Sequence, residues 1–306
     1  MSANEPFWGV DLGGTKIEVS VFHFNNNAID IIDRRRVPTE ASKGYDHIIS
    51  QICKVIDEAR EATGLIPNHI GFSTPGTVEP STGLMKNCNT VVMNGQPMQS
   101  DLTEKLAVPV TLTNDANCFA LAETKMGIVP DVVPNAKVVF GVIMGSGCGG
   151  GVVVNGQVIT GLHGIGGEWG HNFLDESGGD CYCGCVGCVE NIISGTALQN
   201  YYEKQAGQRK LMKDIVESYR AGTDPIAQQT MNRMFSMFGK AISVIINVLD
   251  PDAIVIGGGL GNIDELYIHG VKAVEDNIFN KRVVNTPFLR PKLGDSAGVF
   301  GAALAR

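Results

Sequence analysis

The chain has 306 residues, of which 24 are lysine or arginine and 32 are aspartate or glutamate, so its formal net charge is −8. Hydrophobic residues make up 43% and charged residues 18%, which is typical of globular proteins and argues against a disordered chain. The acidic balance argues against a nucleic-acid-binding surface, and the length suggests two domains with cores of their own.

The start of the chain, up to Pro6, is short and polar. We therefore expect no secretory signal peptide and a cytoplasmic location. Segment 138–154 carries no charge and could pass for a membrane span, but it contains glycines that each cost a helix about 1 kcal/mol. We expect two buried strands joined by a glycine turn there, and no membrane association.

Strands and helices alternate along the chain, which predicts an α/β fold. Apolar alternation and short apolar runs predict strands at 7–12, 17–21, 29–37, 70–72, 110–112, 138–144, 152–154 and 253–256. Helical periodicity predicts helices at 45–62, 102–106, 114–126, 263–279 and 295–304, and a mainly helical segment at 189–249. A strand, a glycine turn and a second strand open the chain and recur from residue 138, which suggests two related lobes.

Three glycine-rich turns follow strands, with the sequences DLGGTK at 11–16, GSGCGGG at 145–151 and GGGLG at 257–261. Glycine lets backbone N–H groups converge on an anion, because no Cβ blocks the approach. One such turn is more typical of a hairpin, but three at strand ends favour a nucleotide site. The first two match a P-loop and GxGxxG only by letter, because each opens onto a strand where those motifs need a helix.

Two carboxylates stand at strand ends. Asp11 adjoins the first glycine turn, where it suits a hydrated Mg²⁺ ion or, alternatively, caps the turn. Asn114 and Asp115 follow a strand and begin a helix, where both residue types are common N-caps. One of the pair suffices as a cap, so Asp115 is a candidate general base.

A crowded group of cysteines predicts a metal site. In GEWGHNFLDESGGDCYCGCVGCVEN, His171, Cys181, Cys183 and Cys188 offer one imidazole and three thiolates, a closed tetrahedral set that suits structural Zn²⁺. Cys185 is a fifth candidate, so the choice of thiols stays open. Glu168 and Glu190 bracket the group and are either ligand-binding or solvated loop carboxylates.

The motifs DLGGT, GSGCGGG and IGGGL, in this order, resemble the sugar-kinase/actin-type ATPase fold, and with the cysteine segment the chain resembles the ROK sugar kinases over essentially its whole length. The resemblance implies duplicated ribonuclease-H-like domains with a cleft for sugar and ATP. It implies a small α/β lobe of 1–115 plus 293–306, a large α/β lobe of 116–292 that carries the zinc loop, and a homodimer.

The resemblance also implies a role for each motif. The first two turns would hold the phosphates of ATP with Mg²⁺, and the third would border the adenine. Asp115 would be the catalytic base, and it would bind the sugar together with Asn114, Glu168, His171 and Glu190, with weaker contacts from Gly76 and Asn89. His171 would ligate zinc through one ring nitrogen and offer the other to a sugar hydroxyl. The nucleotide-binding residues would be Asp11, Gly13, Gly14, Thr15, Lys16, Gly145, Ser146, Gly147, Gly149, Gly150, Gly257, Gly258 and Gly259.

The function predicted from the sequence is therefore ATP-dependent phosphorylation of a hexose at its 6-hydroxyl. KNCNT at 86–90 and NGQP at 94–97 look most like bacterial ROK fructokinases, so fructose is the first expectation, with N-acetylglucosamine, glucose and mannose as alternatives. A sugar-sensing ROK regulator is disfavoured, because those regulators carry an N-terminal helix–turn–helix domain and six residues precede the first strand here. A catalytically dead sensor would require the loss of Asp115 or of a glycine turn.

Overall fold

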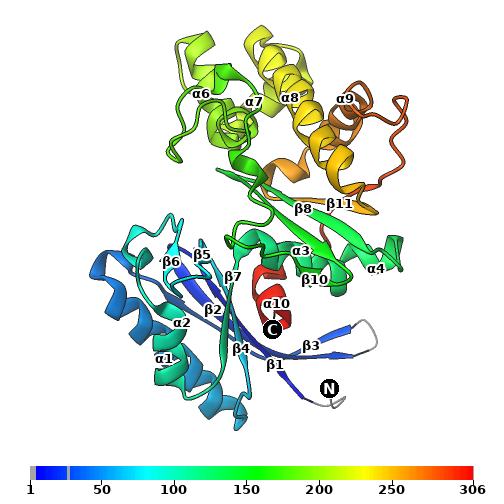
Figure 1. The fold of residues 1–306 in the computed structure, drawn as a ribbon. Helices are drawn as coiled ribbons and strands as arrows, with labels where there is room; N and C mark the ends of the chain where they lie inside the picture. The colour runs from blue at the N-terminus through cyan, green and yellow to red at the C-terminus, as the bar shows by residue number, and fades with distance from the viewer. Residues whose placement is uncertain (1–4, 26–27, 306) are drawn as a thin grey trace. The chain divides into compact units, whose positions relative to one another are not determined.

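The computed structural model describes residues 5–25 and 28–305 (Figure 1); the first four residues of the polar chain start lie outside them. The chain divides into two compact units and contains two five-stranded sheets. The first unit comprises Met1–Asn135, Gly151–Gly167 and Lys292–Arg306, and the second comprises Ala136–Gly150 and Glu168–Pro291. Within the described residues, no helix has the length and apolarity that crossing a membrane requires.

The sheet of the first unit has the strand order β3-β2-β1-β4-β7. Its strands are β1 (Phe7–Leu12), β2 (Lys16–Asn25), β3 (Ala28–Pro38), β4 (Ile70–Thr74) and β7 (Val110–Asn114). β2 pairs antiparallel with β1 and β3, whereas β4 pairs parallel with β1 and β7. The carboxyl ends of β1, β4 and β7 therefore meet at one edge, where ligands gather in open α/β sheets.

Helices cover both faces of this sheet (Figure 1). α1 (Tyr45–Thr63) and α2 (Met98–Leu106) lie on one face, and α10 (Ala297–Leu304) lies on the other, packed against α3 (Asp115–Lys125). α1 buries the apolar stripe predicted from its periodicity, and it ends at Gly64, whose left-handed conformation closes the last turn. This part of the chain also contains a short hairpin and a short helix. The hairpin is formed by β5 (Thr77–Val78) and β6 (Met85–Lys86), and the helix is α4 (Ile128–Val132).

The first unit includes α3, α4 and residues 151–167 in addition to the segments assigned to the small lobe from the sequence. Close packing on α10 joins α3 to this unit. A Cβ on Gly301 of α10 would lie only 1.8 Å from the carbonyl oxygen of Cys118 in α3, so the glycine lets the two helices touch through their backbones. α10 in turn packs against β1 and β4.

The second sheet has the order β10-β9-β8-β11-β12. Its strands are β8 (Val138–Met144), β9 (Cys148–Val154), β10 (Gln157–Val158), β11 (Ala253–Gly257) and β12 (Phe288–Leu289). Counted along the chain, the strands of both sheets have the same order, third-second-first-fourth-fifth. This confirms the duplication predicted from the recurring strand–turn–strand pattern. The boundary between the units passes through β9, after Gly150.

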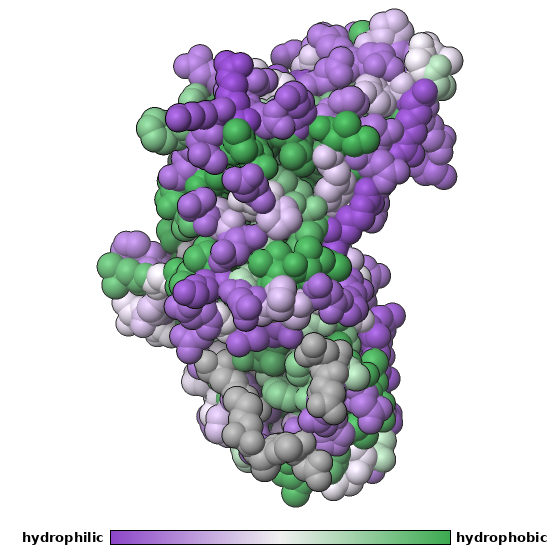
Figure 2. Space-filling view, turned by 90° about the vertical axis from the view of Figure 1, so that its right-hand side faces the viewer, coloured by the Kyte–Doolittle hydropathy of each residue, from purple (hydrophilic) through white to green (hydrophobic). Residues whose placement is uncertain are grey.

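The second unit is rich in helices, as predicted for 189–249. They are α5 (Glu190–Ile193), α6 (Gly195–Ala206), α7 (Met212–Ala221), α8 (Pro225–Leu249) and α9 (Val271–Glu275). α6 to α9 lie on one side of β8 and β11 (Figure 1). The helix predicted at 263–279 is shorter than expected: it begins with a π-helical turn at Leu266–Gly270 and ends at Glu275. Figure 2 shows hydrophobic areas interspersed with hydrophilic ones on one face of the molecule.

Candidate functional site

The edge formed by β1, β4 and β7 gathers the predicted polar residues of the first unit. Asp11 lies opposite Ser73 in the β1–β4 pairing, and Thr74 lies opposite Asn114 in the β4–β7 pairing. Burial raises the pKa of the Asp11 carboxyl above its ordinary value. A divalent cation beside it would favour the charged form, so Asp11 suits the Mg²⁺ role expected of it.

Asn114 and Asp115 lie at the junction between β7 and α3, as predicted. Asn114 is the N-cap, and its side chain accepts a hydrogen bond from the N–H of Ala116. Asp115 is the first helical residue and is exposed to solvent. An exposed carboxylate at the ligand-binding edge of a sheet can accept a proton from a bound hydroxyl group.

The first glycine turn is held by Thr39, which follows β3. Its hydroxyl donates to the carbonyl oxygen of Gly13 at 2.7 Å, and its N–H donates to the carbonyl oxygen of Thr15 at 3.0 Å. Lys16, predicted to bind nucleotide, has its ammonium 3.4 Å from the buried carboxylate of Glu18. Glu18 was not singled out from the sequence, and its position inside a strand carries no signal that would have found it.

Gly76 and Asn89, predicted as weaker sugar contacts, differ in exposure. Gly76 is buried, and a Cβ there would lie 2.4 Å from the sulfur of Cys88, so packing of the β5–β6 hairpin explains this glycine. Asn89 is exposed. The loop before it is held by Asn94, whose side-chain amide exchanges two hydrogen bonds with the backbone of Cys88, at 2.8 and 3.0 Å.

The second glycine turn is shorter than the sequence predicts. Only Gly145–Gly147 forms the turn, closed by a hydrogen bond of 3.0 Å from the N–H of Gly145 to the carbonyl oxygen of Gly147. β9 begins at Cys148, so Gly149 and Gly150 are strand residues rather than turn residues. The prediction of a turn over 145–151 was wrong because a run of glycines carries no side-chain alternation that could mark a strand.

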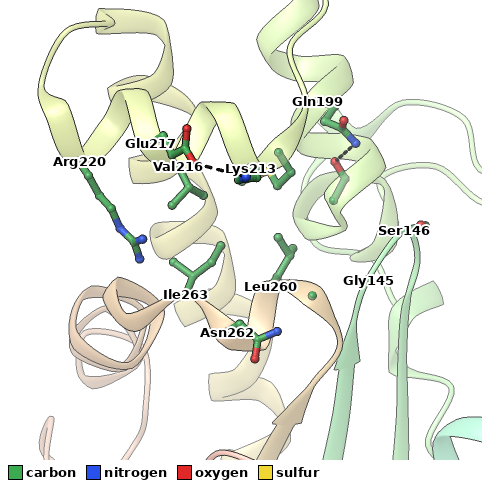
Figure 3. Close-up of a pocket in the computed structure, with 13 residues that line it drawn as sticks. Gly145, Ser146, Gln199, Lys213, Val216, Glu217, Arg220, Leu260, Asn262 and Ile263 are labelled. Atoms are coloured by element: carbon green, nitrogen blue, oxygen red, sulfur yellow. Dashed lines mark hydrogen bonds and ion pairs between the residues drawn. The ribbon is translucent and has the colours of Figure 1, made fainter. Parts of the chain in front are cut away.

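A cavity of about 600 Å³ in the second unit brings together residues from the second and third glycine turns (Figure 3). Gly145 and Ser146 line it together with Gly259. Leu260, Val216 and Ile263 give it an apolar wall, whereas Lys213 and Glu217 of α7 form an ion pair of 3.9 Å at its side. An apolar cavity bordered by glycine turns can hold an aromatic base next to a phosphate group.

Gly257 and Gly258 are outside the lining of this cavity. Gly257 is the buried last residue of β11. Gly258 has a φ of +79°, and a Cβ there would lie 2.4 Å from the carbonyl oxygen of Met144, so only glycine fits. These two residues shape the turn, and Gly259 presents it to the cavity.

The four predicted metal ligands come together in the segment 168–190, called the metal segment below. The ligand atoms of His171, Cys181, Cys183 and Cys188 all lie within 4.8 Å of one another. The pKa of Cys183 is lowered to about 7, because the backbone N–H of Cys185 donates to its sulfur. One imidazole and three thiols, one of them readily deprotonated, fit a tetrahedral zinc ion.

The structure resolves which thiols belong to this group, which the sequence left open. Cys185 is exposed and its sulfur is not among the clustered ligand atoms. The N–H of Cys181 donates to the carbonyl oxygen of Cys185 at 2.8 Å, and this hydrogen bond closes a tight turn. Spacing alone could not exclude Cys185, because the conformation of the turn decides where each sulfur points.

Two of the three predicted sugar contacts in the metal segment, His171 and Glu190, have protein partners. Nδ1 of His171 lies 3.6 Å from the sulfur of Cys181, and Nε2 lies 3.0 Å from the hydroxyl oxygen of Tyr182. The nitrogen expected to face a sugar hydroxyl therefore contacts Tyr182 instead, a residue that the sequence did not single out. Glu190 accepts a hydrogen bond of 2.8 Å from the N–H of Cys148. Burial raises the pKa of Glu168.

Comparison with known proteins identifies the family and supports the fold. A sequence model of the ROK family matches residues 7–305. The chain is 33% identical to an N-acetyl-D-glucosamine kinase from Pectobacterium atrosepticum, over 97% of this chain and 98% of the relative. It is 34% identical to an N-acetyl-D-glucosamine kinase from Haemophilus influenzae, again over 97% and 98%.

Solved structures give the same result for the fold. A ROK hexokinase from Thermus thermophilus superposes with a TM-score of 0.86 at 29% identity, covering 98% of this chain and 97% of the other. A ROK glucokinase from Streptomyces griseus, solved with glucose and AMPPNP, superposes with a TM-score of 0.77 at 26% identity, covering 98% and 99%. The predicted two-lobed α/β fold is confirmed.

Proposed function

This chain belongs to the ROK family, and we propose that it is an ATP-dependent kinase that phosphorylates N-acetyl-D-glucosamine at its 6-hydroxyl. The observation that carries the proposal is full-length similarity, at 33% and 34% identity, to N-acetyl-D-glucosamine kinases. The motifs alone favour fructose. Relatives that match over 97% of the chain favour N-acetylglucosamine. This comparison includes far more residues than the short motifs do.

The proposed reaction transfers the γ-phosphoryl group of ATP to the sugar. A bond forms between the 6-hydroxyl oxygen and the γ-phosphorus, and the bond from this phosphorus to the bridging oxygen breaks, so that ADP leaves with the electron pair. Asp115 accepts the hydroxyl proton, and Asn114 binds sugar hydroxyl groups beside it. Phosphoryl transfer depends mainly on positioning and charge stabilisation, so the base acts chiefly by being placed within reach of the hydroxyl group.

The nucleotide is assigned to the cavity of Figure 3, which residues of the second and third glycine turns line. The adenine occupies the apolar part beside Leu260, and the phosphates lie at Gly145 and Ser146. Mg²⁺ bound with ATP would neutralise phosphate charge, and Asp11 is the carboxylate proposed to hold it through water. The metal segment is proposed to bind one structural zinc ion through His171 and its three cysteines.

A panel of four aldohexoses that differ only at C2, together with the ketose fructose, tests the proposal. ADP release is measured with N-acetylglucosamine, glucose, N-acetylmannosamine, mannose and fructose, each against a reaction without sugar. We expect the highest kcat/KM for N-acetylglucosamine, by about tenfold or more over glucose. The two sugars differ only in the acetamido group, and a site that hydrogen-bonds this group is left with unpaired polar groups when glucose binds. A higher value for fructose would restore the first sequence prediction. No turnover with any sugar would contradict the kinase assignment.

A further inference from the structure

Two side chains at opposite ends of the metal segment bind consecutive residues of β9. The indole N–H of Trp169 donates to the carbonyl oxygen of Gly149 at 2.9 Å. The carboxylate of Glu190 accepts from the N–H of Cys148 at 2.8 Å. Since β9 leaves directly from the turn Gly145–Gly147, both ends of the metal segment hold the exit of that turn.

Trp169 is packed as a core residue although it belongs to a loop. Its side chain is only 3% exposed, and its ring meets that of Phe140 on β8 edge to face, with centroids 5.8 Å apart. A Cβ on Gly150 would lie 2.4 Å from the indole atom Cδ1, closer than two carbon atoms can approach. The glycine at 150, predicted to approach a phosphate, therefore makes room for Trp169.

Two further glycines allow the same close contact. A Cβ on Gly147 would lie 2.5 Å from the carboxylate oxygen Oε2 of Glu190. A Cβ on Gly170 would lie 2.0 Å from the carbonyl oxygen of Cys148. Where the metal segment meets the turn, glycines therefore lie on both sides of the contact. This packing explains part of the glycine content of GSGCGGG.

Each anchor is two residues from a metal ligand. Trp169 shares a 3₁₀ turn with His171, and Glu190 begins α5 just after Cys188. The N–H of Val189 donates to the carbonyl oxygen of Asn172 at 3.0 Å, which joins the two ends of the metal segment. A metal ion ligated by both His171 and Cys188 would fix the separation of the anchors, because ligand bonds order the loop between them.

We propose that Trp169 is a positioning residue that links the metal site to the glycine turn. In the metal-bound form, Trp169 and Glu190 hold Gly145–Gly147 in the conformation that binds nucleotide. The inference rests on the proposed function, in which this turn contacts the phosphates of ATP. Because coupling between two sites is reciprocal, bound nucleotide strengthens metal binding by the same factor.

Fluorescence reports directly on this contact, because the chain contains two tryptophans, Trp8 and Trp169. Trp8→Phe leaves Trp169 as the sole tryptophan. Trp8 is a buried residue of β1, and its indole nitrogen has no hydrogen-bond partner among the described residues, so this substitution removes no hydrogen bond that they make. In the Trp8→Phe protein, we expect removal of zinc by a chelator to shift the Trp169 emission and to weaken AMPPNP binding measured by calorimetry. Zinc added back restores both.

Trp169→Phe, made in the otherwise unchanged chain, keeps an aromatic ring but removes the indole N–H that donates to the carbonyl oxygen of Gly149. We expect it to weaken AMPPNP binding by about 2- to 10-fold, the effect of one neutral hydrogen bond, while zinc content, sugar KM and thermal stability stay close to those of the Trp8→Phe control. A merely structural role would lower stability and affect sugar and nucleotide equally.

Two outcomes separate this inference from the proposed function. If AMPPNP binds with the same affinity with and without zinc, the linkage is wrong while the kinase assignment stands. If the zinc-loaded protein binds no adenine nucleotide at all, the proposed function fails and the inference fails with it.

Discussion

Asn114 and Asp115 share one backbone donor: the N–H of Ala116 lies 3.0 Å from Oδ1 of Asn114 and 2.8 Å from Oδ1 of Asp115. The sequence predicts that one residue of this pair caps the helix and that the other is available for chemistry. The structure shows both side chains oriented by the same N–H at the start of α3. Asn114 supplies the cap, and the same N–H also contacts the carboxylate predicted to be the base.

Asp115→Asn tests this role. The amide oxygen can still accept from Ala116, so the helix start is kept, but the group can no longer take up the sugar proton. We expect kcat to fall by about 10²–10⁴-fold with zinc content and melting temperature unchanged. Asp57→Asn, which alters an exposed acid of α1, is the matched control and keeps full activity. Activity within tenfold of the wild type would contradict the assignment.

A pair of neighbouring thiols tests the metal site. Cys183 and Cys185 are both exposed, but only Cys183 lies in the cluster of ligand atoms. We expect Cys183→Ser to lose bound zinc and to lower the melting temperature, because a serine hydroxyl is a poor ligand for zinc. Cys185→Ser should keep both. The metal content of the purified proteins, measured by atomic emission, decides the matter, and zinc loss in Cys185→Ser alone would overturn the ligand set.

The sequence predicts the fold well where side chains alternate or repeat. β1, β8 and β11 have strong apolar runs, and α1 has a clear apolar stripe, so their positions follow from local sequence. The position of the first half of β9 does not follow from the local sequence, because Cys148–Gly151 has almost no side chains to show a period. One of its glycines, Gly150, makes room for Trp169, whose approach only the tertiary structure reveals.

The residues of the candidate site also fall into those that the sequence could locate and those that it could not. Residues that residue type and spacing bring out, such as the His171 and cysteine cluster and the Asn114–Asp115 pair at a helix start, could be located from the sequence. Residues whose function depends on a neighbour far away in the chain could not. Trp169 is such a case, because its indole N–H donates to the carbonyl oxygen of Gly149, 20 residues earlier, and nothing in the local sequence indicates this partner.

Asp224 provides a prediction about stability and pH. Its carboxylate caps α8 by accepting from the N–H groups of Ile226 and Ala227, and it also binds Lys210 and the hydroxyl of Tyr202. We expect Asp224→Ala to lower the free energy of unfolding by about 2–4 kcal/mol at pH 7, because it removes the cap, leaves the buried Tyr202 hydroxyl without this acceptor and deprives Lys210 of its carboxylate partner. Urea unfolding measures this, and Asp224→Asn, which keeps the cap, should lose less.

The pH dependence of this contribution follows from the pKa of Asp224. The Lys210 ammonium, and then the Tyr202 hydroxyl, hold this pKa well below its ordinary value. The stabilisation is therefore fully present above the unfolded-state pKa of about 4 and is lost as the pH falls below it towards the folded-state pKa. The difference between wild type and Asp224→Ala should shrink below pH 4. A difference that stays constant there would show that the charge of Asp224 contributes nothing.

Met212 and Leu211, at the start of α7, give a matched test of the nucleotide cavity. Met212 lines the cavity, whereas Leu211 is 64% exposed and outside the lining. An acidic side chain at either position is compatible with a helix N-terminus, so both variants should fold. We expect Met212→Glu to weaken AMPPNP binding by about tenfold or more, since it places a negative charge beside a polyanion in a partly apolar cavity, and Leu211→Glu to leave binding unchanged. Calorimetry measures both affinities, and sugar KM should stay constant throughout. Equal affinities in the two variants would show that the nucleotide lies elsewhere.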